Sequence, residues 1–205
     1  MKRTRPASWS FEQVPAKCVK AALSKFKESE PAVCDYMLVK TELLGLPQRR
    51  HRLVAGLPST VQALRSSVLP EGTPLTPMTA VVSPPKGAAY MLASWGRLPD
   101  PQQTTTNPDG TTHNPTIYSG CMVAINRPHP TVMHKPGFWC DSMFRSIRGS
   151  TVEDALLWQT FPVSYKVPHN RFDSHMSVGN AFPPAVAKIV CAAVARVHAP
   201  GRLAA

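Results

Sequence analysis

The stretch GLPQRRHRLVAG, residues Gly45–Gly56, places three arginines and one histidine within five residues, directly before an apolar run. Most charge clusters of this kind are solvated surface loops. Here the following residues, RLVAG, have the composition of a buried strand. We therefore expect the arginines to stand immediately before a strand, where their place is set by the fold.

The residues on either side predict an α/β fold. Residues 9–14 (WSFEQV) and 33–40 (VCDYMLVK) have the composition of strands, and between them Val19, Leu23 and Phe26 recur at helical spacing. The predicted order is strand, helix, strand, loop, strand. This order corresponds to one half of an α/β sheet.

A loop-rich region follows the last of these strands. Residues 57–130 contain twelve of the 22 prolines of the chain, and they include the polar run Gln102–Asn114. Short strands are predicted at TAVVS (79–83) and AAYMLASW (88–95). We interpret this region as an insertion that carries binding loops.

Two helices are predicted near the end of the chain. Ser150 or Thr151 can cap a helix in STVEDALLWQTF, and Pro183 and Pro184 suit the opening turn of PPAVAKIVCAAVARV. The second helix has a continuous apolar face.

Composition limits the class of protein. The chain has 205 residues, and 23 Lys and Arg against 12 Asp and Glu give a formal net charge of +11. This charge favours a polyanionic partner, with nucleic acid the first choice and a membrane surface the second.

The first residues, MKRTRPASWS, lack the apolar segment of a signal or membrane helix, so we expect an intracellular protein without a membrane role. The five cysteines include no C-x-x-C pair, so neither a disulfide framework nor a metal site is predicted.

Five segments, in this order, resemble the DNA (cytosine-5) methyltransferase family. They are FEQVP (11–15), GLPQRRHR (45–52), RPHPT (127–131), RGSTVEDALLWQTFPVSYKV (148–167) and SVGNAFPPAVA (177–187). Each segment is weak evidence alone, and the ordered set carries the resemblance. The segments correspond to the second half of a usual family member.

The resemblance implies roles for several side chains. Glu12 of E-Q-V falls where the family's Glu hydrogen-bonds the flipped cytosine, although Gln13 replaces the usual Asn. Arg50 and Arg52 of Q-x-R-x-R imply contacts to the base and support for the catalytic loop, whereas Arg49 and His51 alternate away from them and are expected to be structural or to face solvent. The simpler interpretation of Glu12 is a strand-end carboxylate paired with Lys17 or another surface cation.

The remaining motif residues imply binding. Gln48 belongs to Q-x-R-x-R, and Arg148 and Thr151 match an R-x-x-T pattern that organises the DNA-recognition region, so all three are assigned to DNA binding; helix capping by Thr151 is compatible with this. Asn180 and Ala181 fall where family members touch S-adenosylmethionine. A plain turn with Gly179 at its corner is the alternative.

Two family motifs are missing from the sequence. No cysteine follows a proline, so the Pro-Cys-Gln loop of the nucleophile is not found, and no glycine-rich cofactor loop is present. We therefore expect an α/β fold that is the C-terminal half of a methyltransferase-like doubly wound sheet with an irregular recognition region. The expected domains are a partial catalytic domain (1–56), a target-recognition region (57–130), and a last part (131–205) whose closing helix returns to the catalytic domain.

Three functional hypotheses follow. The first is one part of a split methyltransferase that acts on double-stranded DNA, with a protein partner that supplies the cysteine and completes the S-adenosylmethionine site. The second is a non-catalytic DNA-binding or regulatory protein that uses the charge of +11. The third is a truncated gene product without a stable function.

Overall fold

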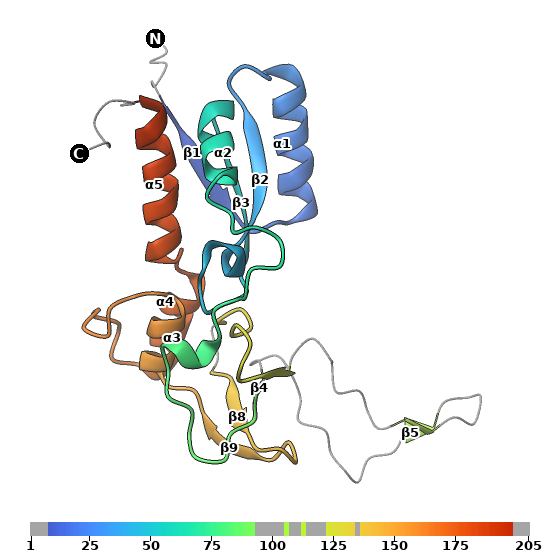
Figure 1. Cartoon of the computed structure of the whole chain (residues 1–205), viewed down its shortest axis with the longest axis vertical. Coiled ribbons are helices and arrows are strands. Elements are labelled where there is room, and N and C mark those ends of the chain that lie inside the picture. Colours follow the sequence, from blue (N-terminus) through green and yellow to red (C-terminus); the bar gives the residue numbers. More distant parts are fainter. Residues whose placement is uncertain (1–7, 93–104, 107–111, 114–121, 134–135, 199–205) are drawn as a thin grey trace. The chain divides into compact units, whose positions relative to one another are not determined.

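A computed structural model describes residues 8–92, 105–106, 112–113, 122–133 and 136–198 (Figure 1). The chain divides into two compact units. Unit 1 comprises residues 1–44, 50–73 and 184–205, and unit 2 comprises residues 45–49 and 74–183. The chain therefore passes between the units four times, after residues 44, 49, 73 and 183, and residues 57–73 lie in unit 1.

Unit 1 is built on a three-stranded sheet. Its strands are β1 (Ser10–Gln13), β2 (Asp35–Lys40) and β3 (His51–Gly56), in the order β1-β3-β2. Helix α1 (Lys17–Ser29) joins β1 to β2, and both of these strands are antiparallel to β3. The predicted strands and helix are confirmed, and the third strand lies between the first two.

Helix α1 covers one face of this sheet. Leu23 of α1 is buried together with Leu53 and Ala55 of β3, and Val19 and Tyr36 pack against them. Successive strand residues point to opposite faces, so Arg52 and Val54 belong to the other face. In Figure 1 α1 lies to the right of the strands.

The other face is covered by two helices, α2 (Pro58–Arg65) and α5 (Pro184–His198). α2 contacts β2, β3 and α5. At the end of β3, Gly56 permits the close approach of the chain before β1, because a Cβ atom there would lie 2.9 Å from the Trp9 carbonyl oxygen. α5 is confirmed as predicted, whereas α2 lies in a region that we expected to be loops. A short 3-10 helix, η1 (Thr41–Leu44), follows β2.

A carboxylate joins the elements of unit 1. Asp35, at the start of β2, accepts hydrogen bonds from Lys27 Nζ of α1 (2.7 Å) and Arg65 Nη1 of α2 (2.8 Å). Burial would raise the pKa of this carboxyl group, but the hydrogen bonds from Lys27, the Tyr36 amide and Arg65 outweigh burial and lower it. The ionised form therefore ties both helices to the strand.

Unit 2 contains a four-stranded antiparallel sheet in the order β7-β4-β8-β9. The strands are β4 (Tyr90–Leu92), β7 (Met122–Ala124), β8 (Phe138–Cys140) and β9 (Ser146–Gly149); β5 (Thr105–Thr106) and β6 (Thr112–His113) pair separately. The unit also holds η2 (Met78–Ala80), α3 (Val152–Trp158) and α4 (Arg171–Asn180).

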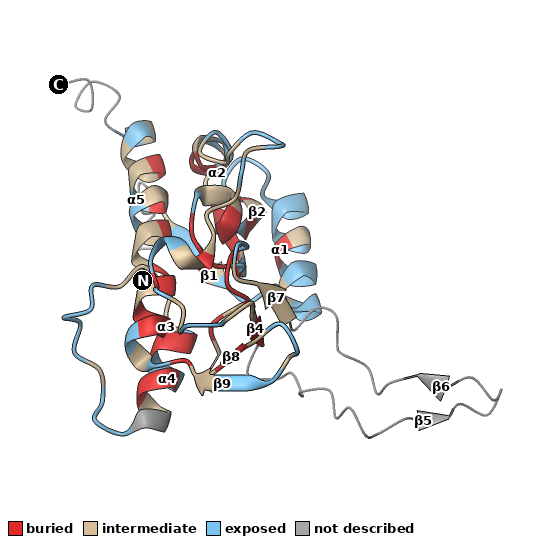
Figure 2. Cartoon of the chain, turned by 60° about the horizontal axis from the view of Figure 1, so that its bottom comes forward, coloured by how far each residue is buried: buried red, intermediate tan, exposed pale blue. Residues whose placement is uncertain are grey.

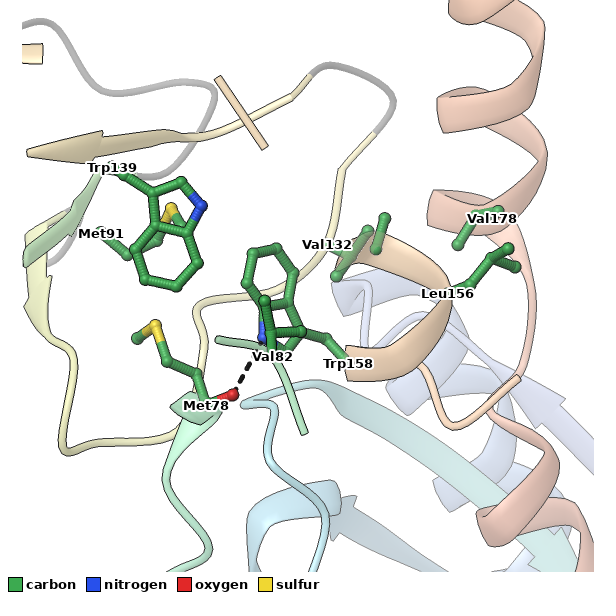
Figure 3. Close-up of a cluster of buried hydrophobic side chains, with 9 residues drawn as sticks. Met78, Val82, Met91, Val132, Trp139, Leu156, Trp158 and Val178 are labelled. Atoms are coloured by element: carbon green, nitrogen blue, oxygen red, sulfur yellow. Dashed lines mark hydrogen bonds between the residues drawn. The ribbon is translucent and has the colours of Figure 1, made fainter. Parts of the chain in front are cut away.

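The core of unit 2 is formed around two tryptophans. Trp139 and Trp158 are buried with their ring centroids 5.8 Å apart. Trp158 Nε1 donates to the Met78 carbonyl oxygen (3.3 Å), as Figure 3 shows. The surrounding buried side chains are Met78, Val82, Met91, Val132, Ala155, Leu156 and Val178.

Two sequence expectations for unit 2 are wrong. The segment TAVVS (79–83), predicted as a strand, contains the end of η2 and then a loop. Its apolar character is explained by Val82, which is buried in the core from this loop. Gly179 does not occupy a turn, since α4 continues to Asn180. The predicted strand near residues 88–95 is confirmed as β4, and its last residues, like most of the run 102–114, lie outside the described residues.

One stretch, Asp173–His198, is long and apolar enough to cross a membrane by length and composition. It is not one continuous helix, since α4 ends at Asn180 and α5 begins at Pro184. A single stretch of this kind is weak evidence for a membrane span, and core helices pass the same test.

Candidate functional site

Two of the predicted catalytic residues form an ion pair in unit 1. Arg52 Nε lies 2.7 Å from Glu12 Oε1, and the side chains are 12% and 32% exposed. The register pairs Glu12 with Val54, so Glu12 and Arg52 are diagonal neighbours on the same face of the sheet. Arg52, and not Lys17, is therefore the cation that pairs with Glu12.

Backbone contacts hold this pair in position. Arg52 Nη1 donates to the His51 carbonyl oxygen (2.8 Å). The Val14 amide donates to Gln13 Oε1 (2.8 Å), so the unusual Gln13 uses its longer side chain to satisfy the next backbone group. Burial lowers the pKa of Arg52, and the neighbouring Glu12 carboxylate opposes this shift.

Arg50 lies buried beside the pair, with 1% of its surface exposed. Its amide donates to Thr41 Oγ1 (2.9 Å) and its carbonyl oxygen accepts from the Thr41 amide (3.0 Å), which joins the start of β3 to the end of β2. Burial lowers its pKa to about 10; the charge of Arg52 adds to this shift and Glu12 opposes it. The group still carries its charge at neutral pH. Arg49 and His51 are exposed, as the alternation predicts.

Gln48 has a different environment, in unit 2. It is fully buried; its Nε2 donates to Gln159 Oε1 (3.2 Å) and its Oε1 accepts from the Val132 amide (2.9 Å). Gln159, in turn, donates to the Val178 carbonyl oxygen (2.6 Å). These bonds give Gln48 a structural role inside unit 2, and its predicted DNA contact stays a prediction. Gln159 was missed; a glutamine at the end of an apolar helix was the available signal.

The motif RPHPT pairs with the residues before the arginine cluster. The His129 amide donates to the Pro47 carbonyl oxygen (2.8 Å), and the Arg49 amide donates to the His129 carbonyl oxygen (2.7 Å). Thr131 Oγ1 donates to the Arg49 carbonyl oxygen (2.6 Å). These two motifs, about 80 residues apart in sequence, form a short parallel bridge. This bridge explains why residues 45–49 belong to unit 2.

The His129 side chain stabilises this bridge from the core side. Its ring stacks on Trp158 at a centroid distance of 3.7 Å, and Nδ1 faces the Pro130 carbonyl oxygen. Burial lowers the pKa of His129 to about 3, so the ring is neutral at physiological pH. The bridge is therefore a packed, uncharged junction.

Arg148 and Thr151 organise the start of α3. Arg148 Nη1 donates to Asp154 Oδ2 (2.8 Å), and its guanidinium lies 5.8 Å from the centre of the Trp139 ring. Thr151 caps α3: Oγ1 accepts from the Asp154 amide and the Asp154 carboxylate accepts from the Thr151 amide, both at 3.1 Å. The predicted cap is confirmed. DNA contacts by Arg148 and Thr151 stay predictions.

The residues predicted to touch S-adenosylmethionine lie at the end of α4. Asn180 is exposed, and the Ala181 amide donates to the carbonyl oxygens of Ser177 and Val178. These bonds consume the one polar backbone donor that Ala181 offers. Of the two residues, Asn180 therefore keeps an exposed polar side chain, and contact with S-adenosylmethionine stays a prediction.

The two buried cysteines, Cys34 and Cys140, do not resemble a nucleophile. Cys34 and Cys140 are buried, and burial raises the pKa of both thiols, whereas a nucleophilic cysteine needs a lowered pKa. Cys18 and Cys191 are exposed, and Cys121 lies outside the described residues. In the same part of the chain, no three His, Cys, Asp or Glu side chains are grouped to hold a metal ion.

Comparison with known proteins supports the fold. No protein-family model and no curated protein matches the sequence. The structure is similar to a crystal structure from Escherichia coli assigned as a DNA modification methyltransferase encoded within a prophage, with a TM-score of 0.56 and 15% sequence identity. The chain has a methyltransferase-like fold. The similarity covers 94% of this chain and 70% of that chain.

Proposed function

We propose that this chain is part of a DNA (cytosine-5) methyltransferase, which transfers a methyl group from S-adenosylmethionine to C5 of a flipped cytosine. A complementing segment or chain supplies the nucleophilic cysteine and completes the cofactor site. The observation that carries the proposal is the 2.7 Å pair between Glu12 and Arg52. It joins the residues that two family-like motifs, 40 positions apart, assign to the same base.

The chemistry needs a carboxyl group at this position. C5 of cytosine is inaccessible in a stacked duplex, so the base is extruded and held along its Watson–Crick edge. One Glu12 oxygen accepts a hydrogen bond from the exocyclic amino group, and the carboxyl group holds a proton at N3; together these interactions withdraw electron density from the ring. Because Arg52 already engages one carboxylate oxygen, the orientation of Glu12 is set before a base arrives.

The arginines complete the binding of the base. A guanidinium presents planar donors to the cytosine carbonyl and to phosphate oxygens, a geometry that lysine does not reproduce. Arg50 is buried and Arg52 nearly so, which fixes both groups with little rotational freedom. When bound, S-adenosylmethionine supplies the methyl group, and the family resemblance assigns Asn180 to its binding.

The test is methyl transfer in the presence of a complementing half. The chain is coexpressed with the N-terminal half of a DNA (cytosine-5) methyltransferase that carries the glycine-rich and Pro-Cys-Gln loops, and labelled methyl transfer to mixed-sequence duplex DNA is measured. We expect activity that Glu12→Gln lowers by about 100-fold or more, because a group acting in the transition state is removed. Glu28→Gln, on the exposed surface of α1, is the matched control and keeps full activity.

Two results would overturn the proposal. One is that no N-terminal half from the same source restores methyl transfer. The other is that Glu12→Gln and Glu28→Gln are equally active.

A second function, DNA binding without catalysis, is supported by the net charge of +11 together with the raised pKa values of Cys34 and Cys140. It predicts DNA binding that Glu12→Gln leaves unchanged, with no methyl transfer under any complementation.

A further inference from the structure

Helix α1 leaves apolar side chains uncovered on unit 1. Leu23 is its one buried residue, and Phe26 is 41% exposed. Figure 2 shows most of α1 in the colour of exposed residues. On the adjoining strand β1, Phe11 is 42% exposed. An open groove of about 430 Å³ lies between them, lined by Phe11, Cys18, Val19, Ala22, Leu23 and Phe26.

The groove borders an unpaired sheet edge. Within the described residues β1 pairs with β3 alone, so alternate backbone N–H and C=O groups of Ser10–Gln13 face away from the sheet. Exposed edges are usually protected by lysine or proline, and β1 contains neither. Val14, directly after the strand, is 50% exposed. Unpaired backbone groups of β1 therefore lie next to exposed apolar side chains. An added strand needs both, because it pairs with the backbone and inserts its side chains into adjoining pockets.

The charge beside the groove selects the occupant. α1 carries four lysines, Lys17, Lys20, Lys25 and Lys27, against the two glutamates Glu28 and Glu30 at its end. Asp35 neutralises Lys27, and the other three lysines are exposed. A second copy of the chain would place one lysine-rich helix near another, which is unfavourable. An acidic partner gains from the same charges.

We propose that the edge of β1 and the α1 groove bind an acidic polypeptide, which adds a strand to β1 and inserts alternate apolar side chains between Phe11 and Phe26. The identity of the occupant rests on the proposed function. The acidic polypeptide is part of the complementing chain, and this surface is where that chain docks. Its geometry depends on unit 1 alone. Binding at this surface requires no methyl transfer.

The test uses a fluorescein-labelled peptide with the sequence Glu-Val-Glu-Val-Thr-Val-Glu and the purified full chain. We expect saturable binding by fluorescence anisotropy, together with slower hydrogen exchange of the β1 amides. Replacing the peptide's glutamates by lysines, or N-methylating its backbone on the pairing edge, weakens binding at least about tenfold, because the charge contacts or the strand hydrogen bonds are lost.

Variants of the chain localise the binding. Phe26→Asp and the double change Lys20→Glu with Lys25→Glu weaken binding of the acidic peptide, and all three positions are exposed, so the fold tolerates them. Val163→Asp, at a 60% exposed valine of unit 2, is the matched control and binds normally.

Three results would overturn the inference: equal binding of the acidic and basic peptides, no saturable binding, or a dimer by light scattering whose formation protects the β1 amides. Since methyl transfer is not measured, failure here leaves the proposed chemistry standing. Conversely, peptide binding by a chain that never supports methylation leaves the docking surface standing.

Discussion

Arg52 serves two purposes in unit 1. It neutralises Glu12 across neighbouring strands, and it is anchored to the His51 carbonyl oxygen. With Arg50 buried next to it, unit 1 holds two cations and one carboxylate on one face of a small sheet. Placing two like charges together costs free energy, which a carboxylate and an anionic ligand both reduce. Such an arrangement is typical of a binding site.

His129 predicts how stability depends on pH. Its pKa is about 3 in the folded chain, against an ordinary value of 6.5, so the unfolded chain binds more protons between these values. Stability therefore falls as the pH drops below about 6.5, with a loss of about 2 kcal/mol at pH 5 from this group. Urea unfolding at pH 7.5 and pH 5, followed by tryptophan fluorescence, measures the effect.

A matched pair of variants isolates this histidine. His129→Phe keeps a ring stacked on Trp158 but removes the titration, so its stability depends less on pH than that of the unmodified chain. Tyr165→Phe, at an exposed position of unit 2, keeps the original dependence. Identical pH dependence in all three proteins would contradict the prediction.

Among the elements, α3 shows how local signals set a short helix. It has seven residues, too few to be stable alone, and it depends on its cap and on its buried residues Ala155, Leu156 and Trp158. The capping box of Thr151 and Asp154 satisfies two backbone donors, while Arg148 fixes the same carboxylate from β9. One aspartate thus couples the helix start to the sheet.

Removing the cap tests this coupling. Thr151→Ala deletes the acceptor of the Asp154 amide, and we expect a loss of about 1 kcal/mol in the free energy of unfolding. Ser59→Ala, at an exposed position inside α2, changes stability by less than about 0.5 kcal/mol. Urea unfolding at pH 7.5 compares the two. The interpretation fails if Thr151→Ala is as stable as Ser59→Ala.

At the scale of the whole molecule, the net charge leads to a prediction about DNA binding. A net charge of +11 on 205 residues predicts binding that depends on the release of counterions. We expect the affinity for duplex DNA to fall by about 100-fold or more between 50 and 200 mM NaCl. Fluorescence anisotropy with a labelled duplex measures it, and an uncharged-backbone analogue serves as the control. An affinity that is independent of salt would contradict this expectation.

The elements found from the sequence are those with a clear period. β1, α1, β2, β3 and α5 follow from alternating or helical apolar patterns, and α3 from its cap. The apolar pattern of the sequence did not predict α2 or α4. α2 begins with a proline in a proline-rich region and has eight residues, and α4 ends in Gly179 and Asn180, which ordinarily indicate a turn. Contacts with neighbouring elements override these weak local preferences.

The sequence indicated which residues form the candidate site, but it predicted only part of their arrangement. Glu12, Arg50 and Arg52 were chosen by resemblance, and alternation predicted that Arg49 and His51 point away from them. The ion pair of Glu12 with Arg52 needed the register of β1 on β3, which no local pattern specifies. The burial of Gln48 needed the distant residues Val132 and Gln159.

The sequence by itself determined the α/β class, the positive charge and the identity of the motif residues, because periodicity, composition and order along the chain are local properties. The tertiary structure decided which of the two units each motif belongs to. The bridge from Pro47 and Arg49 to His129 and Thr131 draws the first half of the arginine cluster into unit 2, while β3 holds the second half in unit 1. Hydrogen bonds between residues about 80 positions apart made that division, and such contacts exist only in the folded chain.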